Sequence, residues 1–213
     1  MKSFVKGLFG RKSKGSRRLE HPRDLMRGDM IGLNDSFALP PELRGKPFRV
    51  VGVNTYQFEH EFDTSFTLES DTDERIDLIV ENDSGLERLA ISMTIERDVV
   101  GTLFDLDEFA KVFDGDEPAA LVLLPGAGCE RWVTDRYHQV AQAERGYYYE
   151  KDYRATRPPG DEGEGEPFDY FQLVSDGGEH ALEIEVFGDG ETEVIVTIYR
   201  PVDDIHDLWP SAE

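Results

Sequence analysis

Few residues in this sequence have the types and the spacing that catalysis requires. Cys129 lies in a glycine-rich turn beside Arg131, a setting that favours a thiolate, but no neighbouring motif supplies a base for it. The five histidines are scattered and form neither H-x-x-x-H nor H-E-x-x-H, so we expect no zinc site. We therefore assign no catalytic, cofactor-binding or metal-binding residues, and the sequence favours a protein that is not an enzyme.

Two acidic runs and one glycine turn resemble binding loops without completing a motif. Residues 105–108 and 114–117 are rich in Asp and Glu, but Ala110 stands where an EF-hand loop needs glycine. The turn at 125–128 lacks the Gly-Lys-Ser/Thr ending of a phosphate-binding loop. The other carboxylates are so numerous that the sequence alone selects no general acid–base pair.

Acidic side chains dominate the charge of this 213-residue chain, which has 45 Asp and Glu against 23 Lys and Arg, a net charge of −22. The charge is divided unevenly: residues 1–27 carry a net +7, whereas residues 28–213 carry 14 basic and 43 acidic side chains, a net −29. Such a body repels nucleic acid, which is bound through cationic groups. The single cysteine forms no internal disulfide and indicates a reducing, cytoplasmic compartment.

The basic N-terminal segment predicts a docking surface for a membrane or a protein partner. Four apolar side chains, at positions 4, 5, 8 and 9, fall along one side of a helix that cations flank, as in a short interfacial anchor at the cytoplasmic face of the inner membrane. Gly7 and Gly10 oppose helix formation and favour the alternative, an unstructured tail. The docking residues we expect are Lys2, Phe4, Val5, Lys6, Leu8, Phe9, Arg11, Lys12, Lys14, Arg17 and Arg18.

Hydrophobic periodicity predicts mainly strands in the remainder of the chain. The period of two is typical of strands, whereas residues 99–113 have the spacing of an amphipathic helix broken near Asp105. Residues 157–167 read as an exposed, mobile acidic loop, and residues 203–209 as a helical turn. The expected strands are 30–33, 48–58, 65–70, 75–81, 88–95, 131–142, 146–154, 169–175, 180–187 and 191–200. Residues 118–124 form either a buried strand or the start of a helix.

The two halves of the body resemble each other at an offset of 105 residues. Phe66 aligns with Phe171, and one extra residue in a turn matches the apolar positions of 75–81 to those of 180–187. We therefore predict a mainly β (α+β) fold. Two duplicated antiparallel meanders form a sandwich or a partly open barrel, with one or two short helices between them. The expected organisation is a flexible tail, 1–27, and a body whose halves are 28–117 and 118–213.

Four segments of the chain resemble a bacterial family. They are FVKGLFGRK at the start, PRDLMRGDMIGL, FRVVGVNTYQFE and the closing TIYRPVDDIHDLW. Together they resemble the YjfK-like group of uncharacterised proteins, over nearly the whole chain. The resemblance implies an accessory role near membrane-stress proteins of the phage-shock type and brings no catalytic residues.

Two functions of different classes follow. The first is a non-catalytic accessory or adaptor protein that acts through an unidentified protein partner, tethered by its basic N-terminus. The second is an enzyme or small-molecule binder with a site between the duplicated sheets, where carboxylates favour a cationic ligand such as a polyamine. Buried, convergent carboxylates in a deep cleft would favour the second function, and a filled apolar interface the first.

Overall fold

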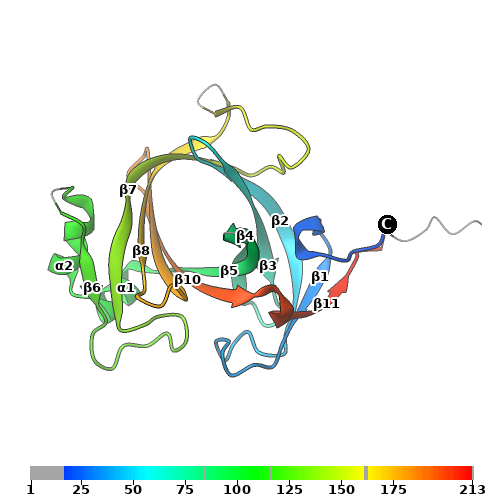
Figure 1. The fold of residues 1–213 in the computed structure, drawn as a ribbon, viewed down its shortest axis with the longest axis horizontal. Helices are drawn as coiled ribbons and strands as arrows, with labels where there is room; N and C mark the ends of the chain where they lie inside the picture. Colours follow the sequence, from blue (N-terminus) through cyan, green and yellow to red (C-terminus); the bar gives the residue numbers. More distant parts are fainter. Residues whose placement is uncertain (1–16, 84, 116, 161–162, 213) are drawn as a thin grey trace, which may run out of the picture.

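Antiparallel strands form most of the computed structural model, which describes residues 17–83, 85–115, 117–160 and 163–212. Eight of them close into a ring in the order β2-β3-β4-β5-β10-β9-β8-β7, because β7 pairs back with β2 (Figure 1). The sheet continues outward from β2 to β1 and β11, and from β7 to β6. The strands are β1 (Met30–Leu33), β2 (Pro47–Gln57), β3 (Phe62–Glu69), β4 (Arg75–Asp83), β5 (Leu86–Ile95), β6 (Ala120–Val122), β7 (Arg136–Tyr149), β8 (Glu166–Val174), β9 (His180–Phe187), β10 (Thr192–Pro201) and β11 (Ile205–Trp209).

The ring confirms the mainly β fold with two antiparallel meanders, and it is a barrel rather than a sandwich. One meander is β2–β5 and the other is β7–β10. Phe66 lies opposite Leu78 across the β3–β4 pair, and Phe171 lies opposite Ile184 across β8–β9. The strand order and this register agree with the offset between the halves, while their common origin stays a prediction.

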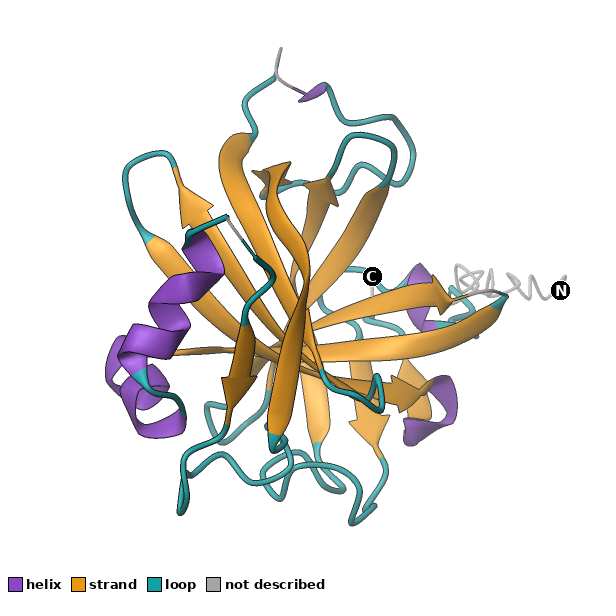
Figure 2. Ribbon diagram, turned by 60° about the vertical axis from the view of Figure 1, so that its left-hand side comes forward, coloured by secondary structure: helices purple, strands orange, loops and turns teal. Residues whose placement is uncertain are grey.

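Two short helices lie outside the ring, at the far left of Figure 2. They are α1 (Arg97–Leu103) and α2 (Leu106–Ala110), and the 3-10 turn η2 (Lys111–Phe113) follows α2 directly. The Asp105 side chain accepts hydrogen bonds from the amides of Asp107 and Glu108, and so caps α2. The expected break in the helical stretch is therefore the N-cap of a second helix.

The strands of the ring turn most of their large buried apolar side chains outward. Alternate residues of a strand point to opposite faces, and in β9 the fully buried Leu182 and Ile184 alternate with Glu183 and Glu185. The apolar set forms one core cluster with side chains of α1, of the segment before β1 and of the loop before β7. Burial of each large apolar side chain contributes about 1.5–3 kcal/mol. The apolar core thus lies between the ring and its outer layer, which leaves the inward face polar.

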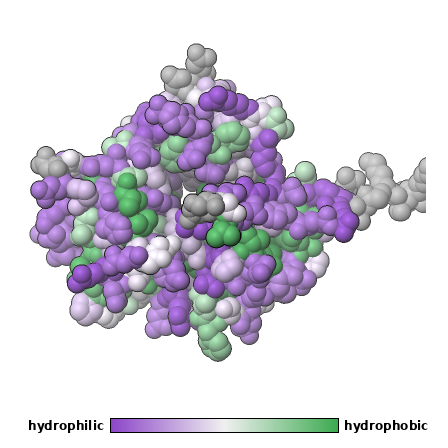
Figure 3. Space-filling view, viewed as in Figure 1, coloured by the Kyte–Doolittle hydropathy of each residue, from purple (hydrophilic) through white to green (hydrophobic). Residues whose placement is uncertain are grey.

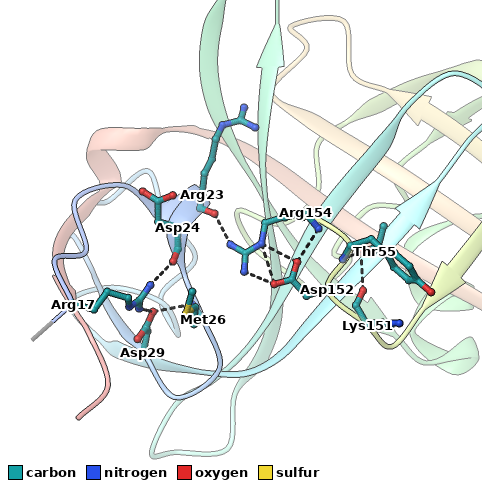
Figure 4. A network of polar contacts seen from close by, with 10 residues as sticks. Arg17, Arg23, Asp24, Met26, Asp29, Thr55, Lys151, Asp152 and Arg154 are labelled. Atoms are coloured by element: carbon teal, nitrogen blue, oxygen red, sulfur yellow. Dashed lines mark hydrogen bonds and ion pairs between the residues drawn. The ribbon is translucent and has the colours of Figure 1, made fainter. Parts of the chain in front are cut away.

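Residues 17–27 pack against the body, which corrects the expected tail boundary at residue 27. Leu25 has no exposed surface. The Arg17 guanidinium pairs with the buried Asp29 and also donates to the Asp24 carbonyl oxygen (Figure 4). From the loop that follows β7, Arg154 donates to the Arg23 carbonyl oxygen at 2.7 Å.

Three other expectations need correction. Residues 203–209 begin with the 3-10 turn η4 (Val202–Asp204) but continue as β11, which pairs with β1. Residues 136–149 form one strand where we expected two. The loop expected at 157–167 is not wholly exposed, because Pro158 is buried, the Gly160 amide donates to Gln57 Oε1 at 3.0 Å, and β8 already begins at Glu166. One further 3-10 turn, η1 (Pro22–Asp24), precedes β1.

Candidate functional site

A cavity of about 350 Å³ lies inside the ring, and side chains from all eight ring strands line it. Most of these side chains are polar, and none of the described lining residues is Lys or Arg. In space-filling form, the face of the molecule seen along the ring is also largely hydrophilic (Figure 3). The acidic lining residues are Glu61, Asp63, Asp77, Glu81, Glu144, Glu183, Glu185 and Glu193.

Strand alternation and one irregularity place these carboxylates. Asp77 and Glu81 alternate with buried apolar residues of β4, so they point inward when their neighbours point to the core. Glu144 reaches the cavity differently, because β7 shifts register between Ala141 and Glu144, where Ala143 has φ 48°. Such a bulge redirects the side chains that follow it.

Three of the carboxylates have partners within the ring. Asp77 Oδ1 accepts a hydrogen bond of 2.7 Å from Thr67 Oγ1. Glu81 Oε2 lies 2.8 Å from Arg88 Nε. Glu183 accepts from Tyr170 OH at 2.7 Å and from Thr197 Oγ1 at 2.6 Å.

Glu185 is the most deeply buried of the lining carboxylates, and no described residue donates a hydrogen bond or offers a cation to it. The residue is only 4% exposed, and it lines the cavity. Directly across the sheet on one side lies another carboxylate, Glu193 of β10, and on the other side lies Tyr170 of β8. Burial, and then the negative charges of Glu183, Glu193 and Asp77, raise the pKa of Glu185 well above its ordinary value. The cavity therefore holds a carboxylate that lacks compensating charge.

Other carboxylates of the cavity share this electrostatic strain. Burial is the main cause that raises the pKa values of Asp63, Asp77 and Glu193. For Glu193, the charges of Glu191, Asp77 and Glu166 act in the same direction. Like charges held together in a partly desolvated space favour protonation or the arrival of a cation.

Aromatic rings form a second part of the cavity wall. The rings of Tyr148, Tyr56, Phe168, Phe58 and Tyr170 form a chain in which successive centroids are 5.1, 5.9, 5.9 and 5.3 Å apart. Three of the five, Tyr56, Phe58 and Tyr170, line the cavity together with the carboxylates. Aromatic faces next to carboxylates are the usual surroundings of bound organic ammonium groups, which aromatic rings attract through their negative faces.

Within the described residues, neither the expected docking residues nor Cys129 and the histidines line this cavity. Of the expected docking residues, those from Lys2 to Lys14 lie outside the described part of the chain. Arg17 is held by Asp29, while Arg18 is 84% exposed and pairs with Glu20 at 2.6 Å.

Cys129 and the histidines show no arrangement for catalysis in the residues that the structure describes. Burial raises the pKa of the Cys129 thiol, and the charge of Glu42 adds to this, which opposes the thiolate that Arg131 was expected to favour. His138 Nδ1 lies 3.6 Å from Asp176 Oδ1 at the surface, and His180 Nε2 lies 3.3 Å from the Arg131 carbonyl oxygen. No group of three or more His, Cys, Asp or Glu in the described ranges is placed to hold a metal ion.

Sequence reasoning missed the individual residues of the cavity, although it gave one usable signal. The alternation of Ile76, Leu78 and Val80 with Asp77 and Glu81 indicated a strand with one apolar and one polar face. The alternation alone predicts that solvent covers the polar face, whereas ring closure turns this face into a cavity wall.

The comparisons with known proteins place the chain in a family. A model described as a domain of unknown function, DUF4178, matches residues 42–201. The chain belongs to the DUF4178 family. The matched range of this DUF4178 protein contains all eight ring strands and omits β1 and β11.

The comparison with curated proteins and the comparison with solved structures give no match. Among the described helices of this DUF4178 protein, none has the length and the apolar character needed to cross a membrane.

Proposed function

We propose that this DUF4178 protein binds a small organic cation inside its strand ring. The observation that carries the proposal is Glu185, which is nearly buried, faces the cavity and has Glu193 and Tyr170 as its cross-strand neighbours. Like-charge repulsion in a partly desolvated site is a free-energy cost that a bound cation removes. Of the features expected to distinguish the two functions, carboxylates that converge on a cavity support the binding function, and one of them, Glu185, is buried.

The lining favours an organic cation over an inorganic one. The side chains of Tyr56, Phe58 and Tyr170 give the cavity wall large apolar and π surfaces beside the acids. An alkylammonium ion uses both features, because its charge meets the carboxylates and its carbon atoms contact the rings. A neutral ligand would leave the negative charge of the carboxylates uncompensated.

Isothermal titration calorimetry at constant ionic strength tests this function, with 1,4-diaminobutane as the probe and 1,4-butanediol as its uncharged control. We expect one molecule of the diamine per chain and no binding of the diol. Glu185→Gln keeps the side-chain size, and removal of its charge should weaken diamine binding about tenfold or more, a loss of at least about 1.4 kcal/mol.

The matched control is Glu130→Gln, which removes one charge from an exposed residue that does not line the cavity. If Glu130→Gln weakens binding as much as Glu185→Gln does, the diamine is held only by the overall negative charge. That result, or binding of the diol equal to that of the diamine, would contradict the proposal.

A second candidate is the accessory role at a membrane or on a protein partner. The uneven charge supports it, because residues 1–27 carry a net +7 and the rest of the chain a net −29. The resemblance to the YjfK-like group is a hypothesis, and it implies this same accessory role. The two functions are compatible, since the ring and the N-terminal segment are separate parts of the chain.

A further inference from the structure

A second cavity continues the first along the ring. It has a volume of about 450 Å³, and five of its lining residues also line the first cavity. These shared residues, Tyr56, Asp77, Thr94, Glu185 and Glu193, form the wall where the two cavities meet. The two cavities therefore adjoin along the ring, and together we call them the channel.

The two ends of this channel open at different places. The first cavity ends near Glu61, just before β3, and near Glu144 on the bulged part of β7. The second cavity reaches Tyr148, Glu150 and Glu166, where β7 ends and β8 begins. Carboxylates line both ends, and Arg75 is the cation among the described residues at the second end.

Carboxylates recur in steps along the neighbouring strands β9 and β10. Glu185 lies opposite Glu193, and Glu183 lies opposite Ile195, two residues away. In the other direction, the Phe187 amide donates to the Glu191 carbonyl oxygen at 2.9 Å, which places Glu191 one further step along the channel. Two residues of a strand advance by about 6.5 Å. Glu183, the Glu185–Glu193 pair and Glu191 thus form three levels of negative charge, a carboxylate ladder that spans roughly 13 Å.

We infer that the channel accepts an extended linear polyamine with at least three ammonium groups, one at each level of the carboxylate ladder. The inference rests on the proposed function and specifies its ligand class. A four-carbon spacer places two nitrogen atoms about 6 Å apart, since each of its five single bonds advances by roughly 1.25 Å. That spacing equals one step of the ladder. Tyr56, which lines both cavities, would contact the methylene groups between the charges.

Titration with amines of increasing length at constant ionic strength tests the inference. The probes are 1,4-diaminobutane, the triamine N-(3-aminopropyl)-1,4-diaminobutane and hexaamminecobalt(III), which carries three charges in a compact shape. We expect the triamine to bind about tenfold more tightly than the diamine, because it reaches a third level. The compact ion should bind more weakly than the triamine, since it occupies only one level.

Glu191→Gln removes the outermost level at an exposed position, and Glu130→Gln is again the matched control. We expect Glu191→Gln to abolish the advantage of the triamine and to leave diamine affinity within about twofold of the wild-type value. Equal affinity for triamine and diamine, or for triamine and hexaamminecobalt(III), would overturn the ladder while leaving the proposed function intact. If none of these cations binds, both the inference and the proposed function fail.

Discussion

Glu185 links the stability of the ring to pH. A carboxyl group whose pKa is raised by folding binds its proton more tightly in the folded chain than in the unfolded chain. Stability is then lost as the pH rises from the ordinary value of 4.5 through the raised pKa of Glu185. The carboxyls of Asp77, Glu193 and Asp63 act in the same direction, because their pKa values are also raised.

We predict that Glu185→Gln stabilises the ligand-free protein at neutral pH, by about 1.4 kcal/mol for each unit by which folding raises the pKa of Glu185. The gain should shrink towards pH 4.5, where the wild-type carboxyl is protonated. Urea unfolding of both proteins between pH 4.5 and pH 8 measures this difference. A difference in unfolding free energy that does not change with pH would contradict the prediction.

At the scale of elements, the contact between β2 and β7 determines whether the cavity exists. Only three residue pairs join these strands, from Thr55–Tyr149 to Gln57–Tyr147. Side chains reinforce them: the buried Thr55 Oγ1 donates to the Lys151 carbonyl oxygen at 2.8 Å and accepts from the Tyr153 amide at 3.2 Å.

Thr55→Val should weaken this contact specifically. The valine side chain has nearly the same shape but neither donates nor accepts a hydrogen bond, so we expect a loss of about 1–3 kcal/mol. Hydrogen exchange should accelerate most at the amides of residues 147–149. The control is Thr64→Val. Thr64 of β3 lies directly opposite Thr55 of β2, and its hydroxyl makes no hydrogen bond with the described residues. Equal effects of the two substitutions would show that ring closure does not depend on these bonds.

The same contact explains which features could be predicted from the sequence. Within each meander, neighbouring strands are close in the sequence, and the turns between them are rich in Gly, Asp and Asn. The period-two pattern was therefore enough to predict these strands. Closure depends instead on residues 55–57 and 147–149, which lie about ninety positions apart and carry no distinctive motif. If closure of the ring is not known, the polar face of β4 is predicted to face solvent. Neither the cavity nor the burial of Glu185 could therefore be predicted. The strand β11 was missed for a similar reason, because its partner is at the opposite end of the chain.

For the whole molecule, the opposite charges of its two regions give a prediction about membranes. We expect weak, salt-sensitive binding of the full chain to anionic vesicles, with about 1 kcal/mol from each Lys or Arg near the surface. Phe4→Ala with Phe9→Ala should reduce binding at every salt concentration. Substitution of Lys12 and Lys14 by Ala should mainly flatten the salt dependence.

Vesicle co-sedimentation measures this binding, and the structure determines the proper control. A chain that begins at Gly28 would lose the buried Leu25, so the comparison should use a chain that begins at Arg17 and keeps the Arg17–Asp29 pair. Equal recovery of the two chains in the pellet would contradict an anchoring role for residues 1–16.

The pairing of β1 with β11 also determines how the molecule would respond to mechanical tension. These strands are antiparallel, and Met30, the first residue of β1, lies opposite Trp209, the last residue of β11. Tension applied through the two ends of the chain first strains the packing of residues 17–27 on the body. After their release, it separates the β1–β11 pair bond by bond, as a zipper opens. It does not shear all their hydrogen bonds at once. The edge strand β11 would then detach at low force, whereas β1 stays paired with β2 and passes the load to the ring.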